Sequence, residues 1–271
     1  MRRAAAAVVV TAIAMSACNV TDRYLPKLLA GETIAPVSGV VGLAIGPNGA
    51  VHYALAGGDV YSLGVRSPEL VAHFPTTRLD SIAFSPVGVL HAAYRDVDGV
   101  TVAAWQDGAA TSVVQVASTD SVDIAFDNDG GLLVGAGDRI VDGQGRVVSG
   151  GWHSPKIAPG RGKRLWVADD APGSAKELVG RGRENDKAKR RRFASALPAR
   201  TDPSDVAVLK NEVLVCSRNY GTVYRLHIGL DDVARRRAPI EGLRCRTAIV
   251  VSVDNSVITA TDDAIVRYGA R

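Results

Sequence analysis

The sequence repeats one unit along its length, and this repeat restricts the fold more than any other feature. Each copy is an apolar run, a turn rich in Pro, Gly, Asn or Asp, and a second apolar run, as in Leu79–Tyr94. Six copies align on a central alanine, at Ala44, Ala83, Ala125, Ala158, Ala207 and Ala248. Their spacing averages roughly 40 residues, which lies in the range of propellers and other repeat arrays.

The apolar runs have the character of strands in a radial sheet. The first run of each copy is apolar almost throughout, as expected of an inner strand that neighbouring blades cover on both faces. A third strand usually follows and alternates better, as Thr222–Leu226 does. The 28 glycines and the 5% aromatic content suit many tight turns rather than a helical bundle. The sequence therefore predicts an all-β, six-bladed propeller over residues 33–271.

The last copy ends at Tyr268 after only three strands. The segment around Ile34 has strand-like residues but no partner nearby in the sequence. We therefore expect the segment near Ile34 to be the fourth strand of the last blade, which closes the ring and removes the open sheet edges.

The first residues have the pattern of a targeting segment. Arg2 and Arg3 precede the apolar run Ala4–Ala14, and small residues then lead to Cys18. A cysteine at this point resembles a bacterial lipoprotein signal, which implies a signal peptide at 1–17, diacylglycerol on Cys18 and a tether at 18–32. We expect an extracytoplasmic protein that is anchored to the bacterial cell envelope. The alternatives are an ordinary secretory peptide and an uncleaved anchor.

Cys216 and Cys245 remain after such processing. In an oxidising compartment they form one disulfide, or they are two small buried apolar residues, and the sequence leaves both open. The formal net charge of +4 includes Arg2 and Arg3 and gives no reason to expect a nucleic-acid partner. We expect a monomer whose partner is a sugar or an unidentified protein.

Three charged stretches have a simple structural interpretation. The basic stretch Arg181–Phe193 falls in the longest gap between copies and is interpreted as a solvated loop, with a patch that rests on anionic lipid headgroups as the alternative. Arg235–Pro239 is interpreted as a loop between the last two blades. Asp127–Gly130 is interpreted as a turn, because the rest of a calcium-loop ligand series is missing.

The sequence contains no nucleophile elbow, phosphate loop or zinc-spaced His/Cys set. Of the five histidines, His52 and His91 occupy equivalent positions in the first two copies. This equivalence indicates residues of the repeat rather than a pair of metal ligands.

Several segments together resemble the soluble PQQ-dependent glucose/sorbosone dehydrogenases, which are six-bladed propellers. The resemblance covers most of the chain after the leader and is carried by Leu43–Gly49, Arg78–Gly88, Leu165–Asp170, Pro203–Val208, Gly221–Leu226 and Leu243–Val250. Much of it is blade consensus that other six-bladed propellers share.

The resemblance implies site residues at the axial mouth of the ring. His73 matches the general base, although its spacing to Arg78 differs from that of the family by one residue, and Arg78 would support the substrate oxygen or the cofactor. Arg244 and Arg246 match the arginine pair that holds the carboxylates of pyrroloquinoline quinone (PQQ). His153 stands where the family has a cofactor-binding arginine. The family's calcium loop has no counterpart, so no calcium is expected.

Two functions follow from the sequence. The first is a quinone-dependent sugar dehydrogenase with PQQ as its cofactor. The alternative is a catalytically inactive propeller lipoprotein that binds a ligand or a protein with the same face. The departures from the family pattern leave open whether the protein is an enzyme.

Overall fold

The computed structural model describes residues 30–64, 67–118, 120–160, 164–169, 174–179, 189–192, 197–198, 201–228, 234–237 and 242–269. Every regular element among these residues is a β-strand. No helix in this part of the chain is long and apolar enough to cross a bilayer. The predicted signal peptide, Cys18 and most of the predicted tether lie outside the described residues.

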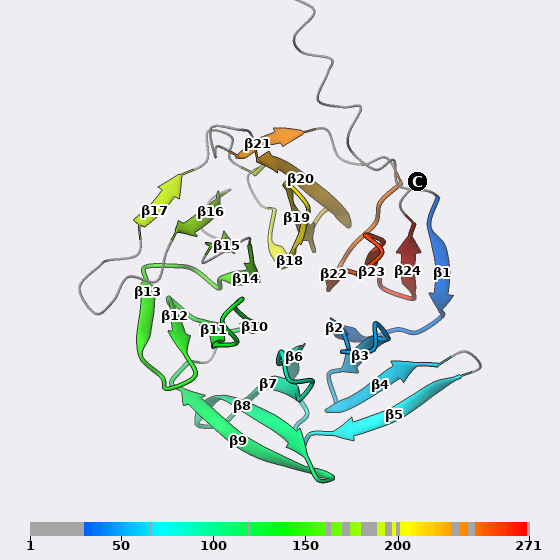
Figure 1. Cartoon of the computed structure of the whole chain (residues 1–271), viewed down its shortest axis with the longest axis vertical. Coiled ribbons are helices and arrows are strands. Elements are labelled where there is room, and N and C mark those ends of the chain that lie inside the picture. The colour runs from blue at the N-terminus through cyan, green and yellow to red at the C-terminus, as the bar shows by residue number, and fades with distance from the viewer. Residues whose placement is uncertain are drawn as a thin grey trace, which may run out of the picture.

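Within the described ranges, the strands form six four-stranded antiparallel sheets around a central axis, one for each sequence repeat (Figure 1). From the axis outwards, blade 1 is β2 (Val40–Ile45), β3 (Val51–Leu55), β4 (Asp59–Leu63) and β5 (Pro68–His73). Blade 2 is β6 (Leu79–Phe84), β7 (Leu90–Asp96), β8 (Gly99–Gln106) and β9 (Ala109–Val116). Blade 3 is β10 (Val122–Phe126), β11 (Leu132–Ala136), β12 (Arg139–Asp142) and β13 (Val147–Gly150).

The other three blades follow in the same order around the ring. Blade 4 is β14 (Lys156–Pro159), β15 (Arg164–Asp169), β16 (Ser174–Val179) and β17 (Lys189–Arg192). Blade 5 is β18 (Pro203–Leu209), β19 (Glu212–Ser217), β20 (Thr222–Ile228) and β21 (Ala234–Arg237). Blade 6 is β22 (Ile249–Val251), β23 (Val257–Ala260), β24 (Ile265–Tyr268) and β1 (Glu32–Ala35). The predicted all-β propeller is confirmed.

The hydrophobic core lies between neighbouring blades. Ala158 of blade 4 packs with Val206 of blade 5, and Ala44 of blade 1 packs with Ile82 of blade 2. Small side chains suit these positions because the inner strands converge on the axis, where there is little room between sheets. The central alanines that align the sequence repeats therefore have a packing role.

Blade 6 joins the two ends of the propeller chain. β1 pairs with β24, with Glu32 opposite Arg267 and Thr33 opposite Val266. Ala35 is buried in a cluster with Ala248 and Ile265. The pairing predicted for the segment near Ile34 is therefore observed, and it closes the ring.

Two of the predicted loops are partly wrong. Lys189–Arg192 forms β17, which pairs with β16, and Ala234–Arg237 forms β21, which pairs with β20. Both are outer strands, whose ladder hydrogen bonds need no apolar side chain, and charged residues on edge strands hinder pairing between molecules. Hydrophobic alternation is therefore a poor guide to these strands. The other residues of the two predicted loops lie outside the described part of the chain.

His52 and His91 repeat one local arrangement, as their sequence positions predicted. Their Nδ1 atoms lie 3.1 Å and 3.0 Å from the carbonyl oxygens of Ala50 and Val89. Each ring contacts a phenylalanine of the next blade, Phe84 or Phe126. Burial lowers the pKa of both imidazoles, so they act as neutral packing groups.

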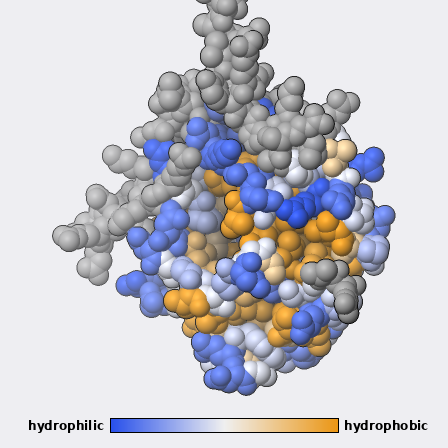
Figure 2. Space-filling model, turned by 45° about the vertical axis from the view of Figure 1, so that its right-hand side comes forward, coloured by the Kyte–Doolittle hydropathy of each residue, from blue (hydrophilic) through white to orange (hydrophobic). Residues whose placement is uncertain are grey.

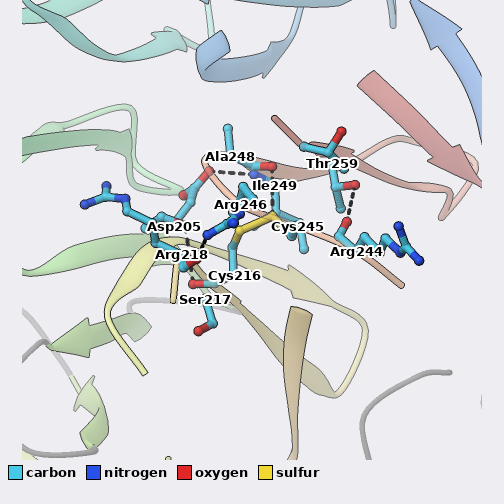
Figure 3. Close-up of a disulfide and its surroundings, with 12 residues drawn as sticks. Asp205, Cys216, Ser217, Arg218, Arg244, Cys245, Arg246, Ala248, Ile249 and Thr259 are labelled. Atoms are coloured by element: carbon cyan, nitrogen blue, oxygen red, sulfur yellow. Dashed lines mark hydrogen bonds between the residues drawn. A yellow bond between two sulfur atoms is a disulfide. The ribbon is translucent and has the colours of Figure 1, made fainter. Parts of the chain in front are cut away.

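A disulfide links Cys216 of β19 to Cys245, which lies in the segment that leads into β22 (Figure 3). The two Cα atoms are 5.4 Å apart, and both residues are fully buried. The sequence left this pairing open. The bond connects blade 5 to the segment that leads into blade 6, the blade that closes the ring.

Loss of this disulfide should destabilise the ring. The bond closes a loop with a sequence separation of 29, for which chain entropy predicts a stabilisation of about 3–4 kcal/mol. We expect the double variant C216A/C245A to lose about this much free energy of unfolding, measured by urea denaturation. Wild type under reducing conditions that open the bond should approach the variant, whereas an unchanged midpoint would contradict a stabilising role.

Candidate functional site

A cavity of about 320 Å³ runs along the axis, and all six inner strands line it. Equivalent positions of neighbouring inner strands contact each other, as Ser81 does with Asp123 and Asp123 with Ile157, so the strands run in the same direction. We call the end where the inner strands begin the entry end. We call the opposite end, where each inner strand turns into the second strand of its blade, the turn end.

The two ends of the cavity differ in chemistry. The lining toward the entry end is polar and includes Asp80, Ser81, Asp123, Lys156, Asp205 and Thr247. The lining toward the turn end is apolar and includes Ile45, Phe84, Phe126, Pro159, Val208 and Val251. A small ligand would therefore meet hydrogen-bonding groups at one end of the cavity and aromatic and aliphatic surface at the other.

Aspartates at the entry end bind backbone N–H groups of the inner strands. Ile157 donates its N–H to Oδ2 of Asp123 at 2.7 Å, and Ile249 donates its N–H to Oδ2 of Asp205 at 2.8 Å. Val122 donates in the same way to Oδ2 of Asp80. An inner strand has a sheet partner on one side only, so these carboxylates satisfy N–H groups that would otherwise face the axis unpaired.

Asp123, Lys156 and Asp205 form a buried charged cluster beside the cavity. Burial raises the pKa of Asp123, and the ammonium of Lys156 opposes that shift. Burial also raises the pKa of Asp205 well above its ordinary value, and the neighbouring charge of Asp123 raises it further. Lys156 is only 6% exposed, and its Nζ donates to Oγ of Ser121 at 3.3 Å. The cluster thus combines a cation, carboxylate acceptors and a carboxyl that favours its protonated form.

One hydroxyl in the lining lacks a partner. Oγ1 of Thr247 is buried and makes no hydrogen bond within the described residues, although Thr247 lines the cavity. A buried hydroxyl without a partner is costly, and a ligand in the cavity is one means of satisfying it. This atom is the feature of the lining that most directly indicates a bound polar molecule.

His73 lies at the entry end, because it is the last residue of the outer strand β5. Its Nδ1 is 2.7 Å from Oδ1 of Asp59, and its side chain is 61% exposed. The chain turns tightly here, since Gly58 has φ of +97° and a Cβ at that position would lie 2.1 Å from the carbonyl oxygen of Phe74. The carboxylate orients the imidazole, which is an arrangement suited to a base.

The other residues implied by the resemblance are also at the entry end, but they are spread around it. Arg78 is exposed before β6, and its backbone carbonyl accepts the N–H of Arg95. His153 is exposed before β14, and its backbone N–H donates to Oδ1 of Asp169. With His73, these residues belong to the connections that enter blades 2 and 4.

Arg244 and Arg246 belong to the connection that enters blade 6, and their side chains point apart (Figure 3). The guanidinium of Arg246 pairs with Asp262 at 3.0 Å and donates to the carbonyl oxygen of Arg218 at 2.7 Å. Arg244 is exposed, and its backbone N–H donates to the hydroxyl of Tyr268. The two arginines therefore do not form a convergent pair.

The implied cofactor does not fit these residues. A tricarboxylate such as PQQ needs guanidinium groups that converge on it, whereas Arg246 already faces Asp262 and Arg244 points elsewhere. None of His73, Arg78, His153, Arg244 and Arg246 belongs to the lining of the axial cavity. No cluster of three or more His, Cys, Asp or Glu residues suited to a metal ion occurs in the described part of the chain.

The residues that do line the polar half of the cavity were missed as site residues from the sequence. Asp123, Lys156 and Asp205 each stand two positions before a central alanine, inside an otherwise apolar inner strand. The sequence signal that could have identified them is a charged side chain that recurs at the same position of a buried strand. The carboxylates of Asp123 and Asp205 accept hydrogen bonds from the neighbouring inner strands, and they also line the cavity.

The pKa of Asp205 predicts a pH dependence of stability. A raised pKa in the folded state provides stability that is complete below the ordinary pKa of aspartate and is lost as the pH rises through the folded value. We expect the free energy of unfolding of wild type to fall relative to that of Asp205→Asn as the pH rises from the ordinary pKa of aspartate, about 4, through the raised folded value. Urea denaturation across this range measures it, with the exposed Asp107→Asn as control, and a constant difference would disprove the assignment.

No family model matches the sequence, and the search of curated proteins gives no match. Solved propellers of similar structure include the PQQ-bound aldose sugar dehydrogenase from Streptomyces coelicolor, at 15% identity and a TM-score of 0.73, covering 91% of this chain and 100% of that one. The apo aldose sugar dehydrogenase from Escherichia coli has 15% identity and a TM-score of 0.65, covering 89% and 99%. A gluconolactonase from Xanthomonas campestris has 14% identity and a TM-score of 0.68, covering 89% of each chain. The chain therefore shares its fold with sugar dehydrogenase and gluconolactonase propellers.

Proposed function

We propose that this protein is a lipid-anchored, extracytoplasmic propeller that binds a sugar in its axial cavity and does not use a quinone. The observation that carries the proposal is the cavity itself, whose volume of about 320 Å³ is at the small end of the roughly 300–1,000 Å³ typical of ligand pockets. A monosaccharide is a ligand of suitable size and polarity for it.

The lining suits the two kinds of surface that a sugar presents. Hydroxyl groups both donate and accept hydrogen bonds, and the buried cluster of Asp123, Lys156 and Asp205 offers acceptors and a cationic donor. Phe84 and Phe126 supply aromatic surface for the C–H groups of a pyranose ring. The unpaired Oγ1 of Thr247 provides one more group for a ligand hydroxyl. The activities named for the similar propellers, aldose dehydrogenation and gluconolactone hydrolysis, also concern sugars.

The anchoring part of the proposal rests on the sequence. The Arg pair, the short apolar run and the small residues before Cys18 have the order of a lipoprotein signal. The disulfide between Cys216 and Cys245 is in keeping with an oxidising compartment. Mass spectrometry of the mature N-terminus tests the anchor, since an unmodified Cys18 or a cut elsewhere would disprove it.

The hydroxyl of Thr247 offers a sharp test of sugar binding. We expect Thr247→Val to fold as well as wild type, because it removes an unpaired buried hydroxyl at nearly constant volume. Its affinity for the bound aldose should fall about 5-fold, which corresponds to one hydrogen bond of about 1 kcal/mol. Calorimetric titration of an aldose panel measures this, with Thr111→Val on the exposed face of β9 as the matched control. Absence of binding to any aldose, or equal affinity in both variants, would contradict the proposal.

A quinone titration tests the proposal that the protein does not use a quinone. We expect PQQ with calcium to give no saturable absorbance change at micromolar protein and no dye reduction with aldoses, because the arginines do not converge. The contact of His73 with Asp59 favours the competing dehydrogenase hypothesis. Tight quinone binding with turnover that His73→Ala abolishes would establish the dehydrogenase instead.

A further inference from the structure

We infer that the turn end of the propeller rests on the phospholipid bilayer in which the protein is anchored, so that the polar entry end faces away from the membrane. This inference rests on the proposed lipid anchor at Cys18. It goes beyond that proposal because an anchor alone does not decide which face of the ring touches lipid.

The turns at the turn end carry four exposed apolar residues, which we call the turn-end patch: Pro47, Pro86, Val87 and Val253. Val87 is 86% exposed and Val253 is 84% exposed. Both valines stand at the tips of turns, where a flat surface would meet them first. Figure 2 shows that exposed hydrophobic and hydrophilic residues both occur on the surface of the ring.

The turns of the patch contact one another. A Cβ on Gly88 would lie 3.2 Å from Cγ of Pro47, and a Cβ on Gly49 would lie 3.9 Å from Cγ2 of Val253. A Cβ on Gly130 would lie 3.5 Å from Cγ of Pro86. The turns of blades 6, 1, 2 and 3 therefore form one arc rather than four separate projections.

The chain enters the propeller at this same end. Glu32, the first residue of β1, is opposite Arg267. The side chain of Arg267 donates to Oδ2 of Asp254 and to Oγ of Ser256, which follow Val253 in the turn between β22 and β23. The start of β1 thus lies beside the turn-end patch. Arg267 also compensates the charge of Asp254, which would otherwise oppose contact with lipid.

The length of chain before β1 keeps this end near the anchor. Residues 19–29 separate Cys18 from the first described residue, Ala30. Fully extended, they would span at most about 40 Å. A lipid on Cys18 therefore holds the turn end within reach of the bilayer surface, and exposed apolar turn tips favour contact with it.

Fluorescence quenching at three valines tests this orientation. Val87→Cys and Val253→Cys place a label in the patch, and Val97→Cys places one on a 98% exposed turn after β7, at the entry end. Cys216 and Cys245 are buried in their disulfide and leave the new thiol as the site of labelling. The full chain is reconstituted through its lipid in phosphatidylcholine and phosphatidylglycerol vesicles that contain doxyl lipid.

We expect the labels at positions 87 and 253 to shift to shorter emission wavelength and to lose at least about half of their intensity to doxyl lipid. The label at position 97 should remain unquenched. Equal quenching at the three positions, or quenching confined to position 97, would overturn the inference.

A second experiment tests this inference independently of the proposal that Cys18 carries a lipid. If the isolated protein carries no lipid, the anchoring proposal fails, and the same labelled proteins with Cys18→Ser are tethered to nickel-chelating vesicles through an N-terminal hexahistidine tag. Quenching at positions 87 and 253 then still supports an intrinsic preference of the turn end for lipid. Unquenched labels in this experiment would show that the patch has no such preference.

Discussion

The hydrogen bonds between aspartates and neighbouring inner strands are the interaction on which the rest of the structure depends. Each inner strand has a sheet partner on one side and faces the axis on the other, so its backbone needs acceptors that do not come from the sheet. Asp123 and Asp205 supply them to the next blade. The same carboxylates make the entry half of the cavity polar, so one set of side chains both joins blades and gives the cavity its chemistry.

Most of the fold could be predicted from the sequence, because blades repeat. The spacing of Ala44, Ala83 and their counterparts indicated the propeller, and the missing last strand indicated pairing near Ile34. The outer strands β17 and β21 could not be predicted in this way. Their runs of Lys and Arg have no hydrophobic alternation, since backbone pairing to a single neighbour sets their conformation.

The residues of the functional site were harder to predict from the sequence than the fold was. The resemblance to quinone-dependent dehydrogenases identified His73, Arg78, His153, Arg244 and Arg246, and chain topology does place them at one end of the ring. Their side-chain directions depend on local partners such as Asp262 that no linear spacing reveals. The cavity residues follow from a simpler rule, which is that a charged residue inside an apolar inner strand lies beside the axial cavity. That rule needs the radial arrangement to be known first.

The pairing of β1 with β24 also bears on how the protein is made. Among the described strands, β1 is synthesised first and β24 last, and the two are partners. Until β24 has been synthesised, blade 6 cannot form and the ring stays open along one side. A chain that lacks β24 would therefore lose circular closure as well as one strand, and it would expose the edges of an open sheet.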